Sequence, residues 1–147
     1  MILDELNEFA DATALPTSGT GAALVGDVID LGVNPNDVEG MYLVIQVDTA
    51  VTSAGSATVA FALASDAQAA IAVDGSATTH FATSAIAKAT LVAGYRVAAV
   101  ALPKGPYERY LGIITTVGTA ALTAGKINAF LTNNINTWKA YDAPYQL

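Results

Sequence analysis

Hydrophobic and polar residues alternate with a period of two along several stretches of this chain, which is the pattern of a β-strand with one buried face. In residues 41–48, MYLVIQVD, the alternation places Leu43, Ile45 and Val47 on the same face. The alternation recurs in residues 57–64, 97–102, 109–117 and 126–132. Weaker strands are expected at residues 24–31, 69–73 and 78–86. No long segment follows the periodicity of an α-helix, so the pattern predicts a β-protein.

Two residues stand out against the apolar rows of these strands. Thr115 is the polar exception in the apolar row of residues 109–117. Phe130 lies on the face opposite the row that Ile127, Ala129 and Leu131 form. Alanine alternates with larger residues in several of the predicted strands, and these small side chains permit close approach between sheets or subunits.

Turn-forming sequences with proline or glycine separate the predicted strands. They are NPND at 34–37, SAGS at 53–56, VDGS at 73–76, PKGP at 103–106 and TAGK at 123–126. About eight short antiparallel strands with regular turns predict one all-β domain, a β-sandwich or jelly roll. The jelly roll is expected over residues 22–132, after an N-terminal arm or loop at 1–20 and before an aromatic C-terminal tail at 133–147.

The first eleven residues admit two interpretations. Ile2, Leu6, Phe9 and Ala10 have a spacing that fits one short helix. An extended arm is the alternative, and the sequence does not decide between them.

Composition indicates an unusually neutral surface. Charged residues make up 13% of the chain, against about 25% in a typical globular domain. Such a surface tends to be covered by partners, because large uncharged patches left in water promote association. Eleven of the thirteen acidic residues lie in residues 1–74, and all six Lys and Arg lie between Lys88 and Lys139. Acidic and basic segments either pair within the fold or make a polar molecule that orients against its neighbours.

The sequence offers little chemistry. Cysteine is absent, and His80 is the lone histidine, so neither a transition-metal site nor a catalytic triad is expected. The net charge of −7 argues against nucleic-acid binding. The longest apolar run, residues 97–102, is far too short to cross a membrane, and the acidic N-terminus does not resemble a secretion signal. No cofactor and no metal are therefore expected.

The segment PKGPYERYLGII, residues 103–114, combines two bases with two tyrosines. As a nucleic-acid patch, Tyr107 and Tyr110 would stack on bases and Arg109 would contact phosphate. As a structural element, PKGP is a turn and Arg109 begins a strand. The second interpretation is simpler in an acidic protein, and tyrosines also suit the rim of a protein interface.

Several segments resemble one known family. They are LVAGYRVAAVALPKGPYERYLGIITTV at 91–117, TAGKINAFLT at 123–132, DVIDLG at 27–32 and MYLVIQVDTAVTSAGSATV at 41–59. Together they resemble the small capsid cement, or decoration, proteins of tailed bacteriophages over about residues 22–132. The chain departs from that pattern in its tail and at Gly112, where a charged residue would be expected after ERYL.

The resemblance implies a non-enzymatic jelly roll that sits on the outside of an icosahedral head and bridges major capsid subunits. It further implies a homo-oligomer, with a dimer favoured over a trimer, made in the host cytoplasm and located on the virion. No nucleic-acid or membrane partner is implied. The candidate capsid or self-association contacts are Ile2, Leu3, Leu6 and Phe9 in the arm, Trp138, Tyr141 and Tyr145 in the tail, and Tyr107, Arg109 and Tyr110.

Two other functions remain open at this point. One is a receptor- or carbohydrate-binding jelly roll of a phage tail fibre, in which aromatic and acidic side chains would form a sugar site. The other is a hydrolase on a β-sandwich, for which His80, Asp27 and Asp30 would be the first residues to test.

Overall fold

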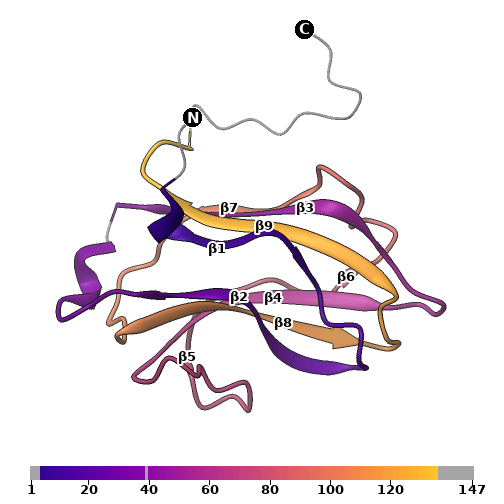
Figure 1. Ribbon diagram of the computed structural model, residues 1–147, viewed down its shortest axis with the longest axis horizontal. Helices are drawn as coiled ribbons and strands as arrows, with labels where there is room; N and C mark the ends of the chain where they lie inside the picture. Colours follow the sequence, from indigo (N-terminus) through magenta and orange to yellow (C-terminus); the bar gives the residue numbers. More distant parts are fainter. Residues whose placement is uncertain (1–3, 39, 136–147) are drawn as a thin grey trace, which may run out of the picture.

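The protein is an all-β sandwich in the computed structural model, which describes residues 4–38 and 40–135 (Figure 1). The described residues form nine strands: β1 (Glu8–Ala14), β2 (Gly21–Asp30), β3 (Tyr42–Thr52), β4 (Thr58–Asp66), β5 (Thr78–Ala82), β6 (Ile86–Ala87), β7 (Arg96–Ala101), β8 (Tyr110–Gly118) and β9 (Ala124–Thr132). Two short 3-10 helices accompany them, η1 (Glu5–Asn7) and η2 (Pro35–Val38). The predicted β-sandwich is confirmed. Within the described residues, no helix could span a membrane.

The strands form two antiparallel sheets with a nested order. Sheet A has the order β1-β9-β3-β7, and sheet B has the order β2-β8-β4-β5, with β6 also paired to β4. Strand β1 therefore pairs with β9, β2 with β8, β3 with β7, and β4 with β5. From the chain ends inward, these four pairs therefore fall alternately in sheet A and sheet B.

The core lies between the sheets and consists of the apolar rows that the alternation predicts. Leu43, Ile45 and Val47 of β3 are fully buried in it, as are the inward residues of β4, β8 and β9. Thr115 is buried among them. Burying an apolar side chain contributes about 1.5–3 kcal/mol each, so these rows supply most of the stabilisation that holds the sheets together.

The N-terminal segment differs from the prediction. Residues 8–14 are not a helix or a free arm but strand β1, at the edge of sheet A. Its register against β9 shifts twice, between Glu8 and Ala10 and between Ala10 and Thr13. These irregularities bury the consecutive residues Phe9 and Ala10. A bulged strand breaks the period-two alternation, so the pattern hides it.

The strand predicted at residues 69–73 is also wrong. The Asp66 carboxylate accepts hydrogen bonds from the backbone N–H groups of Gln68 (3.1 Å) and Ala72 (3.0 Å), and the chain turns there. The pairing strand β5 begins only at Thr78. Ile71 is nevertheless buried, because it packs on the outer face of sheet B.

One end of the sandwich gathers several connections, and we call it the Tyr110 end. Tyr110 begins β8 and pairs with the last residues of β2 and β4, Asp30 and Asp66. In sheet A, Tyr42 begins β3 and pairs with the last residues of β7 and β9. Helix η1, the β2–β3 connection and the β7–β8 connection all lie at this end, at the left of Figure 1.

Candidate functional site

The Tyr110 end brings together the described residues of two segments to which the sequence assigned a contact role. Leu6 lies there in η1, and Arg109 and Tyr110 lie at the start of β8. The chain also leaves β9 at this end. The remaining candidates, Ile2 and Leu3 before η1 and Trp138, Tyr141 and Tyr145 after β9, lie outside the described residues.

Two apolar side chains are strongly exposed at this end. Leu6 is 80% exposed, and Val33, in the β2–β3 connection, is 95% exposed. The sequence singled out Leu6 but missed Val33, because a single valine in a turn-rich loop has no period that could reveal its exposure. Single exposed apolar residues are common on protein surfaces, so Leu6 and Val33 mark positions to test and do not by themselves define an interface.

Two candidates from the sequence are corrected by the structure. Phe9 is fully buried in the core, so its ring does not face a partner. Tyr107 is also buried, since only 4% of it is exposed. Both belong to the support of this end and not to its surface.

Tyr107 braces the β7–β8 connection from inside. Its ring stacks on His80 of β5, with 4.1 Å between the ring centroids. Its hydroxyl donates a hydrogen bond to the carbonyl oxygen of Pro103. Its backbone N–H donates to Asn36 Oδ1 at 3.1 Å, which ties the β7–β8 connection to the β2–β3 connection. The tyrosine thus fixes two loops that the sequence leaves independent.

The buried Ser65 hydroxyl makes hydrogen bonds in the same region. Its hydroxyl oxygen accepts a hydrogen bond from the backbone N–H of Glu108 (3.0 Å) and lies 2.7 Å from His80 Nε2. The Glu108 carboxylate accepts from the Thr78 hydroxyl at 2.7 Å. Burial lowers the pKa of His80, against a weaker opposing effect of Glu108. Ser65 is fully buried, so this serine–histidine pair is closed to a substrate and acts as a structural link.

Arg109 and Asp30 form a bidentate ion pair across the same end. Arg109 Nε and Nη2 donate to the two Asp30 carboxylate oxygens, both at 2.9 Å. The Arg109 guanidinium holds the pKa of Asp30 at about 2, below its usual value. The guanidinium also lies 5.1 Å from the centre of the Tyr110 ring. Arg109 is thus engaged within the chain, which favours the structural interpretation of this segment.

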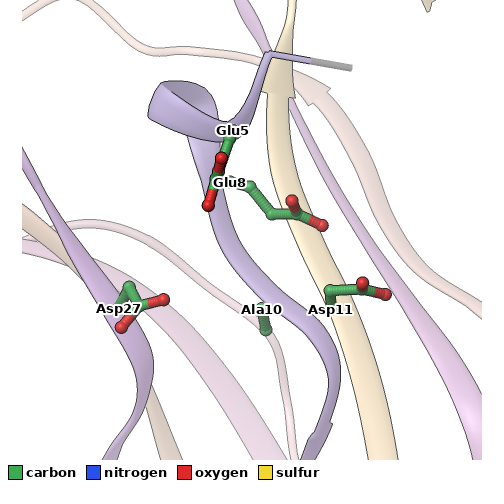
Figure 2. A pocket seen from close by; sticks show the side chains of 5 residues that line it. All are labelled: Glu5, Glu8, Ala10, Asp11 and Asp27. Atoms are coloured by element: carbon green, nitrogen blue, oxygen red, sulfur yellow. The ribbon is translucent and has the colours of Figure 1, made fainter. Parts of the chain in front are cut away.

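An open acidic pocket lies beside these braces, between β1 and β2 (Figure 2). Glu5, Glu8, Ala10 and Asp11 line it from the N-terminal segment, and Asp27 lines it from β2. Burial raises the pKa of Glu8, and the neighbouring carboxylates raise it further. No group of His, Cys, Asp or Glu among the described residues is arranged to hold a metal ion.

The residues of the hydrolase hypothesis do not converge on one site. His80 contacts Ser65 and Tyr107, Asp30 pairs with Arg109, and Asp27 lines the acidic pocket. Each of the three side chains has its own structural environment, and the geometry gives no support to a shared catalytic centre.

Comparison with known proteins places the chain in one family. No curated protein matches it. Residues 9–131 match the model of the Bbp16 family, so the match covers nearly the whole sandwich, from the second residue of β1 to the next-to-last residue of β9. The chain therefore belongs to the Bbp16 family.

Proposed function

We propose that this protein is a capsid cement protein of a tailed bacteriophage. In this proposal it binds the outside of the icosahedral head through its Tyr110 end, bridges neighbouring major capsid subunits and acts as a homo-oligomer without enzymatic activity. The observation that carries the proposal is that the described candidates Leu6, Arg109 and Tyr110 lie at one end of the sandwich, whose loops are tied together by hydrogen bonds and an ion pair. A rigid end loses little conformational entropy on binding.

The fold supports the resemblance on which the proposal is built. The Bbp16 match, residues 9–131, spans almost the same residues as the similarity to cement proteins. The nested pairing of β1 with β9, β2 with β8, β3 with β7 and β4 with β5 is the order that a jelly roll requires. We therefore interpret the sandwich as a jelly roll.

Gly112, the main departure from the cement pattern within the strands, has a local explanation. It lies on the outer face of sheet B, where a Cβ atom would come within 2.7 Å of Ile71 Cδ1 and 2.9 Å of Leu24 Cδ1. A larger residue at this position would have to displace the terminal methyl groups of Ile71 and Leu24. The departure is thus consistent with the packing of Ile71, from the segment after β4, on the outer face of this sheet.

Multivalency explains how such contacts would stabilise a shell. An oligomer that touches several capsid subunits gains avidity even when each contact is weak. A protein that binds the assembled shell and not its free subunits stabilises the shell by mass action. The low charge of the chain suits a surface that is covered by neighbours.

A mixing experiment tests the proposal. Purified protein is incubated with expanded heads that lack it, the heads are pelleted, and the bound copies and the temperature of head disruption are measured. Saturable binding at many copies per head, together with a higher disruption temperature, is the expected result. Absence of binding to heads of its own phage would overturn it. Binding of the isolated protein to glycans would then favour the tail-fibre alternative.

A further inference from the structure

Strand β7 is an open edge of sheet A. Among the residues that the structure describes, β7 pairs only with β3, so one side of its backbone meets no other strand. The unpaired N–H and C=O groups of such an edge form a template on which a further strand can add. Proteins usually protect their edges with bulges, charged side chains or proline.

Bulges interrupt the other long edge strands. The register of β1 against β9 shifts twice, and that of β2 against β8 shifts within the strand. The register of β7 shifts only near its start, before Ala98. From Ala98 the ladder with β3 then runs without interruption to Leu102, whose N–H donates to the Met41 carbonyl oxygen at 2.9 Å. The stretch 98–102 is therefore a regular edge that no bulge protects.

The ladder with β3 decides which backbone groups of this stretch face the open side. The bond from Leu102 to Met41 marks a hydrogen-bonded pair, and such pairs alternate along an antiparallel ladder. Val100 therefore directs its N–H and C=O groups to β3, whereas Ala99 and Ala101 direct theirs to the open edge. No backbone or side-chain group of the described residues binds these outward groups.

The side chains along this edge are small and apolar. Val100 points toward the core and packs against it, yet it remains half-buried because no strand lies beside β7. Ala99 and Ala101 point to the outer face, where Ala101 is exposed. The stretch 97–102 contains no charged residue. Side chains of this kind do not keep a further strand away.

We propose that β7 is the self-association edge of this protein and pairs antiparallel with β7 of a second copy, about a twofold axis at Val100. In this register Ala99 of each copy lies opposite Ala101 of the other. The two pairs make about four backbone hydrogen bonds. All outward groups of both alanines are thereby satisfied, and the four strands of sheet A continue into those of the second copy.

The neighbouring registers are less favourable. An axis at Ala101 would place Ala99 opposite Pro103, which has no N–H group to donate. An axis at Ala99 would place Ala101 opposite Val97, where the register of β7 against β3 shifts. The axis at Val100 is the one that uses the regular stretch 98–102 alone.

The side chains favour a second copy as the occupant of this edge. The axis brings the two half-buried Val100 side chains together and places Ala98 opposite Leu102, so that the apolar cores of both copies join. On the outer face alanine meets alanine. Each copy carries a net charge of −7, but no charged side chains oppose each other across the stretch 98–102. The edge is thus complementary to itself.

This arrangement has a consequence for binding to heads. The twofold axis is perpendicular to sheet A, so the Tyr110 ends of the two copies point in opposite directions along the strands. A dimer with two separate binding ends suits the bridging of capsid subunits. This bridging role rests on the proposed function, whereas the pairing of β7 does not.

Disulfide cross-linking of the full-length protein tests the register. The chain has no cysteine, so Val100→Cys introduces a single thiol. In the proposed dimer the two substituted residues are direct partners with about 4.5 Å between their Cα atoms, which is within the range of a disulfide. The matched control is Ala101→Cys, which is more exposed but lies diagonally across the axis from its copy, roughly 7–8 Å away.

Under mild oxidation we expect Val100→Cys to form a covalent dimer much faster than Ala101→Cys. Random collisions would favour the more exposed thiol at position 101. Equal cross-linking of the two variants, or faster cross-linking of Ala101→Cys, would therefore overturn the proposal.

Sedimentation equilibrium tests the backbone bonds. Ala99→Pro removes an outward N–H that the single chain does not use, and proline is tolerated on the open side of an edge strand. Ala99→Val keeps this N–H and is the matched control. We expect the wild type and Ala99→Val to dimerise with increasing concentration, and Ala99→Pro to dimerise about tenfold more weakly or less. A wild type that stays monomeric, or a folded Ala99→Pro that dimerises as well as the wild type, would overturn the proposal.

Both assays use the isolated protein, so they are independent of head binding. A dimer that cross-links at Val100→Cys but does not bind heads would support the pairing of β7 and contradict only the proposed function. Binding to heads by a protein that fails both assays would contradict only the pairing.

Discussion

At the scale of single residues, Thr115 is the one polar side chain in the otherwise apolar row predicted for residues 109–117. The structure buries it fully, and its hydroxyl has no hydrogen-bond partner among the described residues. Leaving a buried hydroxyl unpaired costs about 1–3 kcal/mol, and valine has nearly the same shape. We expect Thr115→Val to raise the free energy of unfolding by about 1 kcal/mol. Denaturant unfolding would measure the change, with the exposed Thr116→Val as a control. A loss of stability in Thr115→Val would show that the hydroxyl makes a stabilising hydrogen bond in the folded protein.

His80 links stability to pH. Burial lowers its pKa in the folded protein below the ordinary value of 6.5, so the unfolded chain binds the proton more readily. The stability that a neutral His80 contributes is therefore complete above about pH 6.5, the pKa of the unfolded chain. It is lost as the pH falls from that value through the lower pKa of the folded protein. Between about pH 7.5 and 5.5 the free energy of unfolding should fall in the wild type and fall less in His80→Gln. Equal slopes in the two proteins would show that His80 titrates as it does in the unfolded chain.

At the scale of elements, β1 and β2 approach each other closely at Gly26. This residue has φ = +75°, and a Cβ atom there would lie 1.9 Å from the carbonyl oxygen of Phe9. Gly32 has a similar φ of +70° but open space around it. Both alanine variants bear the cost of a left-handed backbone, about 1–2 kcal/mol. Only Gly26→Ala also forces β1 away from β2.

We therefore expect Gly26→Ala to destabilise the protein by about 1–3 kcal/mol more than Gly32→Ala. Thermal and denaturant unfolding of the two variants measures the difference directly. Equal losses would mean that β1 is not held against β2 at this point. The Gly32→Ala variant separates backbone strain from steric overlap, because it shares the first and lacks the second.

The elements that the sequence predicted are those whose alternation is regular. Strands β3, β4, β8 and β9 each have an inward apolar row, and each has a neighbouring strand on both sides. Strand β1 escaped detection because its bulges bury Phe9 and Ala10 in succession. The segment 69–73 was mistaken for a strand because a loop that covers a sheet is as apolar as the sheet.

At the scale of the whole molecule, the sequence proposed candidate contact segments but did not reveal that two of them lie at the same end. Leu6 and Arg109 are far apart in the chain, and only the strand order brings both to the Tyr110 end. The hydrogen bonds from the Tyr107 N–H to Asn36 and from the Glu108 N–H to Ser65 depend on side-chain positions that no sequence period encodes. The exposure of Val33 could not be predicted for the same reason, since residues in loops follow no alternating pattern.

The most direct test of the central proposal asks which end of the sandwich binds heads. Leu6→Asp and Val33→Asp each place a charge on an exposed apolar residue of the Tyr110 end. Val92→Asp makes the same change at the opposite end, before β7, where Val92 is 52% exposed. Copies bound per head are measured for the wild type and the three variants. The predicted result is a marked loss of occupancy for Leu6→Asp and Val33→Asp and none for Val92→Asp. Full occupancy in both variants of the Tyr110 end, or a loss confined to Val92→Asp, would contradict it.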